Sequence, residues 1–244
     1  MKRSSLYIGI ILLLIGCKKS EITQSVSSAS ANFSIHHEIS TAQLLFDTIL
    51  YATPSGYEIS TTRLEYYISD VKFKDASGIT IHQDANAHYI NGRNQQTINI
   101  HNILIKEYQQ IELTLGIPPY LNEHGKIPNT SENVGMIWPI NMGGGYHFLK
   151  FEGHFRKPNQ TSSSGFAIHL GETGNEVIIS VTIPLSINEG NGNNFEINVN
   201  PLEWLTNPND YDFELDANYT MGIPELMQKI QENGSTIVTT ISQQ

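Results

Sequence analysis

Short segments in which apolar and polar residues alternate make up most of this chain after residue 32. A period of two residues is typical of a strand with one buried face. Many such strands joined by loops rich in Gly, Asn and Pro favour an antiparallel β-sandwich or a partly closed barrel, so the chain is predicted to be mainly β. The expected strands lie at 33–39, 44–51, 57–62, 64–73, 97–101, 108–116, 145–155, 165–170, 176–184, 194–200 and 236–242.

Helical periodicity is scarce. The best helix begins at Pro224, a favoured first-turn position, and ends at Gly234, while the segment 202–205 predicts only a short turn. We therefore expect one short C-terminal helix. No internal repeat or composition shift divides the remainder, which predicts a single β domain over residues 32–244.

The N-terminus has the pattern of a lipoprotein signal peptide. Lys2 and Arg3 precede an apolar run that ends in Leu14-Ile15-Gly16-Cys17, and the run is too short to span a bilayer comfortably. A small residue before the cysteine fits cleavage followed by lipid attachment to Cys17. The alternative is an uncleaved membrane helix with a chance cysteine.

Residues 1–16 are accordingly predicted to be the signal peptide and residues 17–31, rich in Ser, Thr, Gln and Ala, a lipidated flexible tether. This places the protein in the bacterial cell envelope, lipid-anchored to a membrane, with the outer membrane as the expected location. Because Cys17 is the sole cysteine, the domain has no disulfide and must fold on its core alone. Without the signal peptide, 12 basic side chains face 24 acidic ones, which argues against a nucleic-acid partner.

The stretch from Met136 to Gly171 concentrates residues suited to chemistry. It holds one of the two tryptophans, two methionines, three of the nine histidines and a triple glycine. Histidine nitrogen and methionine sulfur are ligands of soft and borderline metals, and thioethers favour Cu(I). The segment 117–135 before it, rich in proline, predicts either a lid over this region or a variable surface loop.

Several histidines share a strand face with apolar residues. Alternation places His147 with Leu149 and Phe151, His37 with Ile35, and His88 with Ile90. An imidazole on such a face must hydrogen-bond or bind a metal, because burying an unpaired polar group costs roughly 1–3 kcal/mol. Each is therefore either a metal ligand or a core histidine bonded to a neighbouring group.

His169 alternates with Phe166, Ile168 and Leu170 and so lies on the opposite face of its strand. It is followed two residues later by Gly171, which lets a backbone or a ligand approach closely. Its alternative role is that of a surface histidine at a strand end.

These motifs resemble the MbnP-like copper-binding proteins, many of which are lipoproteins of Bacteroidetes-type bacteria. The resemblance rests on the Met-x-Trp pattern at Met136–Trp138, the strand Leu149–Gly153 and the His-x-Gly element His169–Gly171, and it extends to Arg63–Asp70, His88–Ile90 and Ile111–Ile117. It implies copper bound through histidines drawn from His37, His88, His147 and His169, with Trp138 and Met136 near the metal. In relatives a tryptophan is oxidised to kynurenine by a di-haem peroxidase, so the resemblance also implies such a partner and a modified Trp138.

The chain departs from the family pattern at two positions. Ile140 stands where relatives often have a second tryptophan, and Tyr219–Ile223 has no histidine where many relatives place one before the last helix. A ligand at the second position would be missing.

The sequence as a whole predicts copper capture or handling and not catalysis. No Gly-x-Ser-x-Gly elbow, His-Glu-x-x-His pair or zinc-spaced cysteine set is present. The alternative is a metal-free surface module that binds a peptide, a glycan or a partner protein through the aromatic loops around Tyr120 and Trp138.

Overall fold

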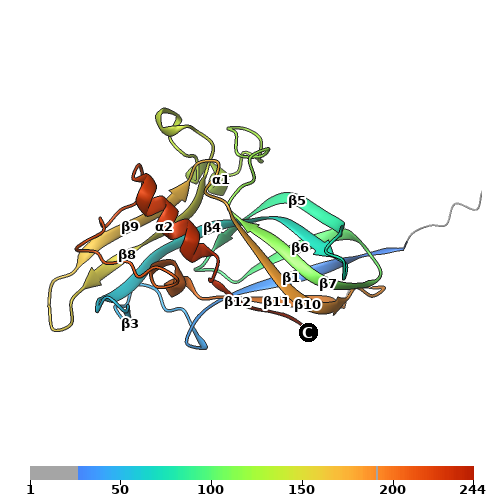
Figure 1. Cartoon of the computed structure of the whole chain (residues 1–244), viewed down its shortest axis with the longest axis horizontal. Helices are drawn as coiled ribbons and strands as arrows, with labels where there is room; N and C mark the ends of the chain where they lie inside the picture. The colour runs from blue at the N-terminus through green and yellow to red at the C-terminus, as the bar shows by residue number, and fades with distance from the viewer. Residues whose placement is uncertain (1–26, 191) are drawn as a thin grey trace, which may run out of the picture.

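The computed structural model describes residues 27–190 and 192–244, and these form two β-sheets around a shared apolar core (Figure 1). The predicted signal peptide, Cys17 and most of the predicted tether lie outside the described residues. The prediction of a mainly β, antiparallel-rich sandwich is confirmed, and the described sheets do not close into a barrel.

The first sheet is built around β1 (Ser28–Ile39). Its order is β12-β11-β1-β2, with β6 also paired to β1; the added strands are β2 (Ala42–Gln43), β6 (Gln96–Leu104), β11 (Asn193–Val199) and β12 (Val238–Gln243). The pairing of β1 with β11 is parallel, and the other pairings are antiparallel. Phe33, Ile35 and His37 of β1 are buried in alternation, as predicted.

The second sheet is built around the long strand β4 (Glu58–Lys74). Its order is β10-β7-β4-β8-β9, with β3 and β5 also paired to β4; the added strands are β3 (Tyr51–Ala52), β5 (Thr80–Asn91), β7 (Glu107–Leu115), β8 (His147–Arg156), β9 (Ser164–Gly171) and β10 (Val177–Ser186). Contacts such as Phe33 with Phe73 join the two sheets in the core. β8 and β9, which carry the predicted motif, lie at one end of this sheet.

The helix α2 (Pro224–Gly234) has the predicted bounds and packs on β9, β10 and the short 3-10 helix η2 (Pro201–Leu205). None of the helices in the described ranges has the length and apolar character needed to cross a membrane.

Several sequence predictions differ from the structure, and β5 was not among the predicted strands. The segments 57–62 and 64–73 form one strand, β4, in which a register shift near residue 62 accommodates the break in the pattern. The segment 44–51 is largely irregular, with Asp47 at a φ of 62°. The strand β1 begins at Ser28, within the segment 17–31 that was predicted to be a tether, and Ser28 and Ala29 pair with β6.

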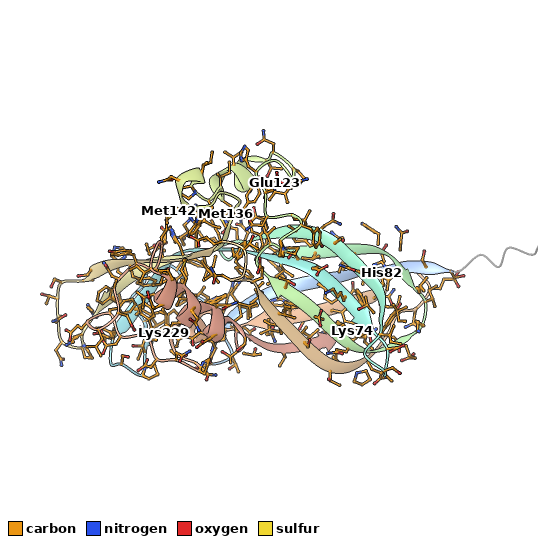
Figure 2. All side chains as sticks on the ribbon, turned by 45° about the horizontal axis from the view of Figure 1, so that its top comes forward. Lys74, His82, Glu123, Met136, Met142 and Lys229 are labelled. Atoms are coloured by element: carbon orange, nitrogen blue, oxygen red, sulfur yellow. The ribbon has the colours of Figure 1, made fainter. Side chains whose placement is uncertain are left out.

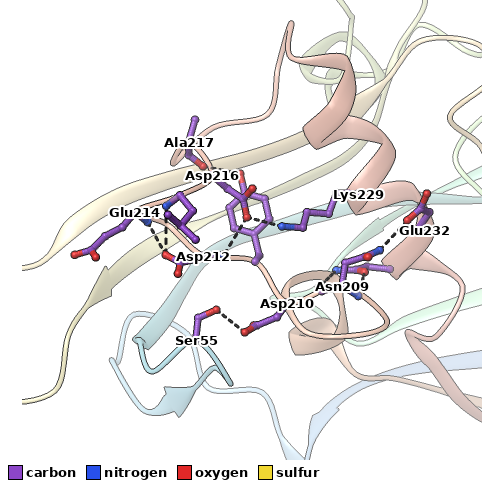
Figure 3. Close-up of polar contacts among 12 residues, drawn as sticks. Ser55, Asn209, Asp210, Asp212, Glu214, Asp216, Ala217, Lys229 and Glu232 are labelled. Atoms are coloured by element: carbon purple, nitrogen blue, oxygen red, sulfur yellow. Dashed lines mark hydrogen bonds and ion pairs between the residues drawn. The ribbon is translucent and has the colours of Figure 1, made fainter.

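The loop between η2 and α2 is held by carboxylates, as Figure 3 shows. Asp216 accepts hydrogen bonds from the backbone N–H of Asp212 (3.0 Å) and from Lys229 Nζ (2.6 Å). Asp212 in turn accepts one from the Tyr57 hydroxyl (2.7 Å). These contacts fix a loop that leads directly to Thr220 and the candidate site.

Candidate metal centre

Trp138 is the central packing element of the candidate site and is 0% exposed. Its indole Nε1 donates to the Met142 carbonyl (2.8 Å), and its backbone N–H donates to the Gly145 carbonyl (2.9 Å). The ring lies against Gly171, where an added Cβ would come within 2.7 Å of Cζ3. The sequence predicted the approach of a backbone or a ligand at this glycine, whereas the group that lies against it is the indole side chain of Trp138.

His147 lies directly beside this indole. The two ring centroids are 4.7 Å apart, and the His147 side chain is 5% exposed. Its Nδ1 contacts the Met136 carbonyl (3.1 Å); because a carbonyl only accepts, Nδ1 carries the proton and Nε2 keeps its lone pair. Burial, helped by the nearby Lys150 ammonium, lowers the pKa of His147 to about 3. The ring is therefore neutral near pH 7.

Alternation predicted that His147 shares a strand face with Leu149 and Phe151, and this prediction is wrong. A register shift between His147 and Leu149 in the β8–β9 pairing interrupts the alternation. The His147 ring instead lies 5.1 Å from the His169 ring, at 86°, and His169 pairs across the strands with Lys150. The bulge thus brings together two of the predicted ligands that alternation had placed on opposite faces.

His169 is held at both its ring and its backbone. Its Nε2 contacts Glu152 Oε1 (2.9 Å), and the His169 bond is the main cause that keeps the pKa of Glu152 below its usual range. The backbone N–H of His169 donates to Thr220 Oγ1 (2.8 Å), and the same hydroxyl donates to the His169 carbonyl (2.5 Å). The segment without the family histidine therefore runs directly beside His169.

The loop before β8 covers the candidate site. Its helix α1 (Ser131–Gly135) and 3-10 helix η1 (Ile140–Met142) belong to the segment that projects from the body of the molecule, where Figure 2 labels Met136 and Met142. Met136 is fully buried, and the terminal carbon of Met142 would lie 3.2 Å from a Cβ added at Gly222.

The covering loop is tied to the sheet. Lys150 Nζ donates to the Gly135 carbonyl (2.5 Å), and the Tyr67 hydroxyl donates to Asn133 Oδ1 (2.7 Å). Burial lowers the pKa of Lys150. Side chains of β4 and β8 therefore hold this loop by hydrogen bonds.

His37 and His88 have other partners. His37 Nε2 contacts the Tyr66 hydroxyl (2.9 Å) in the core, and burial lowers the pKa of His37 to about 4. His88 Nε2 contacts Asp84 Oδ2 (2.6 Å) on β5. Within residues 27–190 and 192–244, no three His, Cys, Asp or Glu side chains form a group that could hold a metal ion. Of the four predicted histidines, His147 and His169 are the two whose rings contact each other.

Three residues of the site were not predicted from the sequence: Arg63, Glu152 and Thr220. Glu152 belongs to the strand motif Leu149–Gly153, and alternation places it on the same face as Lys150. Because Lys150 pairs with His169 across the two strands, Glu152 lies on the same face as His169. Thr220 belongs to the segment where many relatives place a histidine, but its own contact with His169 was not predictable, because it depends on the path of a loop.

One of three comparisons with known proteins, the match to a family model, agrees with the resemblance in the motifs. The family model described as MbnP matches residues 28–226. The solved structure of MbnP from Methylosinus trichosporium is 14% identical and covers 76% of this chain and 80% of its own, with a TM-score of 0.48. A search of curated proteins gave no match.

Proposed function

This chain belongs to the MbnP family, and from that premise we propose that it is a lipid-anchored protein of the bacterial cell envelope that binds copper at His147 and His169. Its role is metal capture or handling and not catalysis. The observation that carries the proposal is the contact between these two imidazole rings. Each ring also has one nitrogen hydrogen-bonded to an oxygen, the Met136 carbonyl for His147 and the Glu152 carboxylate for His169.

The hydrogen bonds of both rings have the pattern of metal-ligating histidines. Such a histidine usually donates its second N–H to a carboxylate or a backbone carbonyl, which fixes the tautomer and the ring orientation. His169 meets a carboxylate in Glu152, and His147 meets the carbonyl of Met136. One nitrogen of each ring, His147 Nε2 and His169 Nδ1, then keeps a lone pair for a metal.

The donor set suits copper better than structural zinc. The centroids of the two rings are 5.1 Å apart. A metal bound by both rings would require one nitrogen of each ring to lie within about 4 Å of the other, because a metal–nitrogen bond is about 2 Å long. Two histidines fall short of the four protein ligands of structural zinc, and among divalent metals copper binds nitrogen most tightly. Met136 and Met142, whose backbone carbonyls contact His147 and Trp138, carry the soft thioether donors that would favour Cu(I).

Trp138 is the proposed target of oxidative modification. It is the tryptophan of the Met-x-Trp pattern, and it packs against His147. We propose that a partner of the di-haem peroxidase type oxidises it. Mass spectrometry of the peptide that contains Trp138, from protein purified from its native envelope, tests this step.

The membrane anchor is proposed at Cys17. The described domain begins near Ser28, so the residues between Cys17 and β1 form the proposed tether. Replacement of Cys17 by Ser should move the protein from the membrane fraction to the soluble fraction. A C17S protein that remains in the membrane fraction would contradict the anchor.

Copper content tests the main proposal. Wild-type protein purified from its native envelope without chelator should contain about one copper per chain, and His147→Ala and His169→Ala should lose it. His154→Ala is the matched control, because His154 lies exposed on the same strand, β8. A wild-type protein that contains no copper and takes up none would reject the copper role and favour a metal-free binding module.

A further inference from the structure

A chain of charged side chains leads to His169 from two neighbouring strands. Arg63 on β4 lies directly opposite Glu152 on β8, and their side chains form an ion pair of 3.4 Å between Nη1 and Oε1. The same Oε1 contacts His169 Nε2 at 2.9 Å. A second ion pair, from Arg63 Nη2 to Glu65 Oε2 at 2.8 Å, holds the guanidinium from its other side.

These bonds determine which nitrogen of His169 carries the proton. Arg63 can only donate, so the Glu152 carboxylate that it pairs with is an acceptor. His169 Nε2 must then be the N–H donor, and Nδ1 keeps the lone pair. Thr220 fixes the backbone of His169 through two hydrogen bonds, so the residue is held at its backbone and at Nε2 of its ring.

The ion pair between Arg63 and Glu152 contributes little to folding stability. The side chains of Arg63 and Glu152 are 37% and 28% exposed, and ion pairs at such positions are weak because water screens them. Removing an outer partner of a metal-ligating histidine, in contrast, typically lowers metal affinity 10–100-fold. The placement is therefore more useful for orientation than for folding.

We infer that Arg63 and Glu152 are positioning residues that make Nδ1 of His169 the metal-binding atom. The inference rests on the proposed copper site. The two histidines then bind through different nitrogens, Nε2 of His147 and Nδ1 of His169, because each ring gives the opposite nitrogen to its oxygen partner.

Nitrogen-15 NMR of the mature, lipidated protein in detergent tests the inference at one fixed pH. In the metal-free wild type, the His169 signals, assigned by their loss in His169→Gln, should show the proton on Nε2. Added Cu(I) should then shift Nδ1 of His169 and Nε2 of His147. In Glu152→Gln the metal-free ring should populate both tautomers, because an amide can either accept from His169 or donate to it.

Copper affinity supplies the second measurement. In a competition titration with a Cu(I) chelator, Glu152→Gln and Arg63→Gln should bind roughly 10–100-fold more weakly than wild type, with an almost unchanged unfolding midpoint. Glu152→Asp, which keeps the carboxylate, should recover part of the loss. Arg156→Gln is the matched control, because Arg156 pairs with Glu58 across the same two strands at similar exposure and should leave affinity unchanged.

The outcomes separate the two proposals. A wild type that binds copper with the His169 proton on Nδ1 would overturn the positioning role alone, as would a Glu152→Gln protein that keeps both tautomer and affinity. A wild type with the expected tautomer that binds no copper would overturn the proposed function.

Discussion

Gly171→Ala should destabilise the protein through one contact, the one with Trp138. The new methyl group would lie 2.7 Å from Cζ3 and 2.9 Å from Cδ2 of the indole, inside the 3.4 Å at which ordinary van der Waals contact begins. The ring cannot turn away freely, because its Nε1 donates a hydrogen bond to the Met142 carbonyl and the ring forms an edge-to-face contact with the His147 ring. Overpacking of this kind typically costs about 1–3 kcal/mol, and straining the indole bond would add about 1 kcal/mol.

Urea unfolding of single and double variants measures this cost. Gly171→Ala alone should lose about 2–4 kcal/mol of unfolding free energy. In a Trp138→Leu background, which lacks the six-membered ring, the same change should cost less than about 1 kcal/mol. Gly165→Ala is the matched control on β9, because the sole group near its added Cβ is a carbonyl at 3.8 Å.

Two results would refute the reasoning. One is a Gly171→Ala protein as stable as wild type. The other is an equal loss in the Trp138→Leu background, which would show that the cost arises from the strand and not from the indole. If Gly171→Ala displaces the indole, the variant should also bind copper more weakly, because the displaced indole would move the His147 ring that it contacts.

Three further outcomes are expected. The pKa of His37 is about 4 in the folded protein and 6.5 in the unfolded chain, so its contribution to stability is complete above pH 6.5 and is lost as the pH falls toward 4. In urea titrations, the unfolding free energy of wild type should therefore fall by about 2 kcal/mol more than that of His37→Gln between pH 7 and pH 5. Equal losses in the two proteins would contradict the lowered pKa. Asp216→Ala removes the acceptor of Lys229 and should lower unfolding free energy by about 1–3 kcal/mol, whereas exposed Glu214→Ala should change it little. Met221→His restores an imidazole to the segment beside His169 and should tighten Cu(II) binding in a competition titration; unchanged affinity would show that this segment cannot reach the metal.

Strand faces were predictable from the sequence where one face is apolar. Alternation correctly buried Phe33, Ile35 and His37 and placed His169 opposite Ile168. It failed for β5, which was not among the predicted strands. Ile90 is the one residue of β5 classed as buried, so the strand carries little apolar signal and owes its place to pairing with β4.

The position of His147 could not be predicted from its own strand. A single bulge reverses the face of every residue beyond it, and the bulge in β8 depends on how β9 pairs with it. Local alternation therefore predicted a regular strand with His147 on the face of Leu149. The contact between His147 and His169 instead depends on how β9 pairs with β8. The histidine in the core, His37, and the histidine at the sheet edge, His88, were equally good sequence candidates because alternation cannot tell which strand ends converge.

The two motifs that identified the family form one structural unit. Met-x-Trp and His-x-Gly are about thirty residues apart in sequence, yet Trp138 fills the space that Gly171 leaves open, and the histidine two residues before that glycine then faces His147. Packing against Trp138 explains the glycine, whereas the role proposed for the histidine is copper binding. The packing role of Gly171 does not depend on a bound metal. A family member that lost copper binding could therefore keep Trp138 and Gly171 for stability while losing His169, so the histidine is the more informative marker of a copper site.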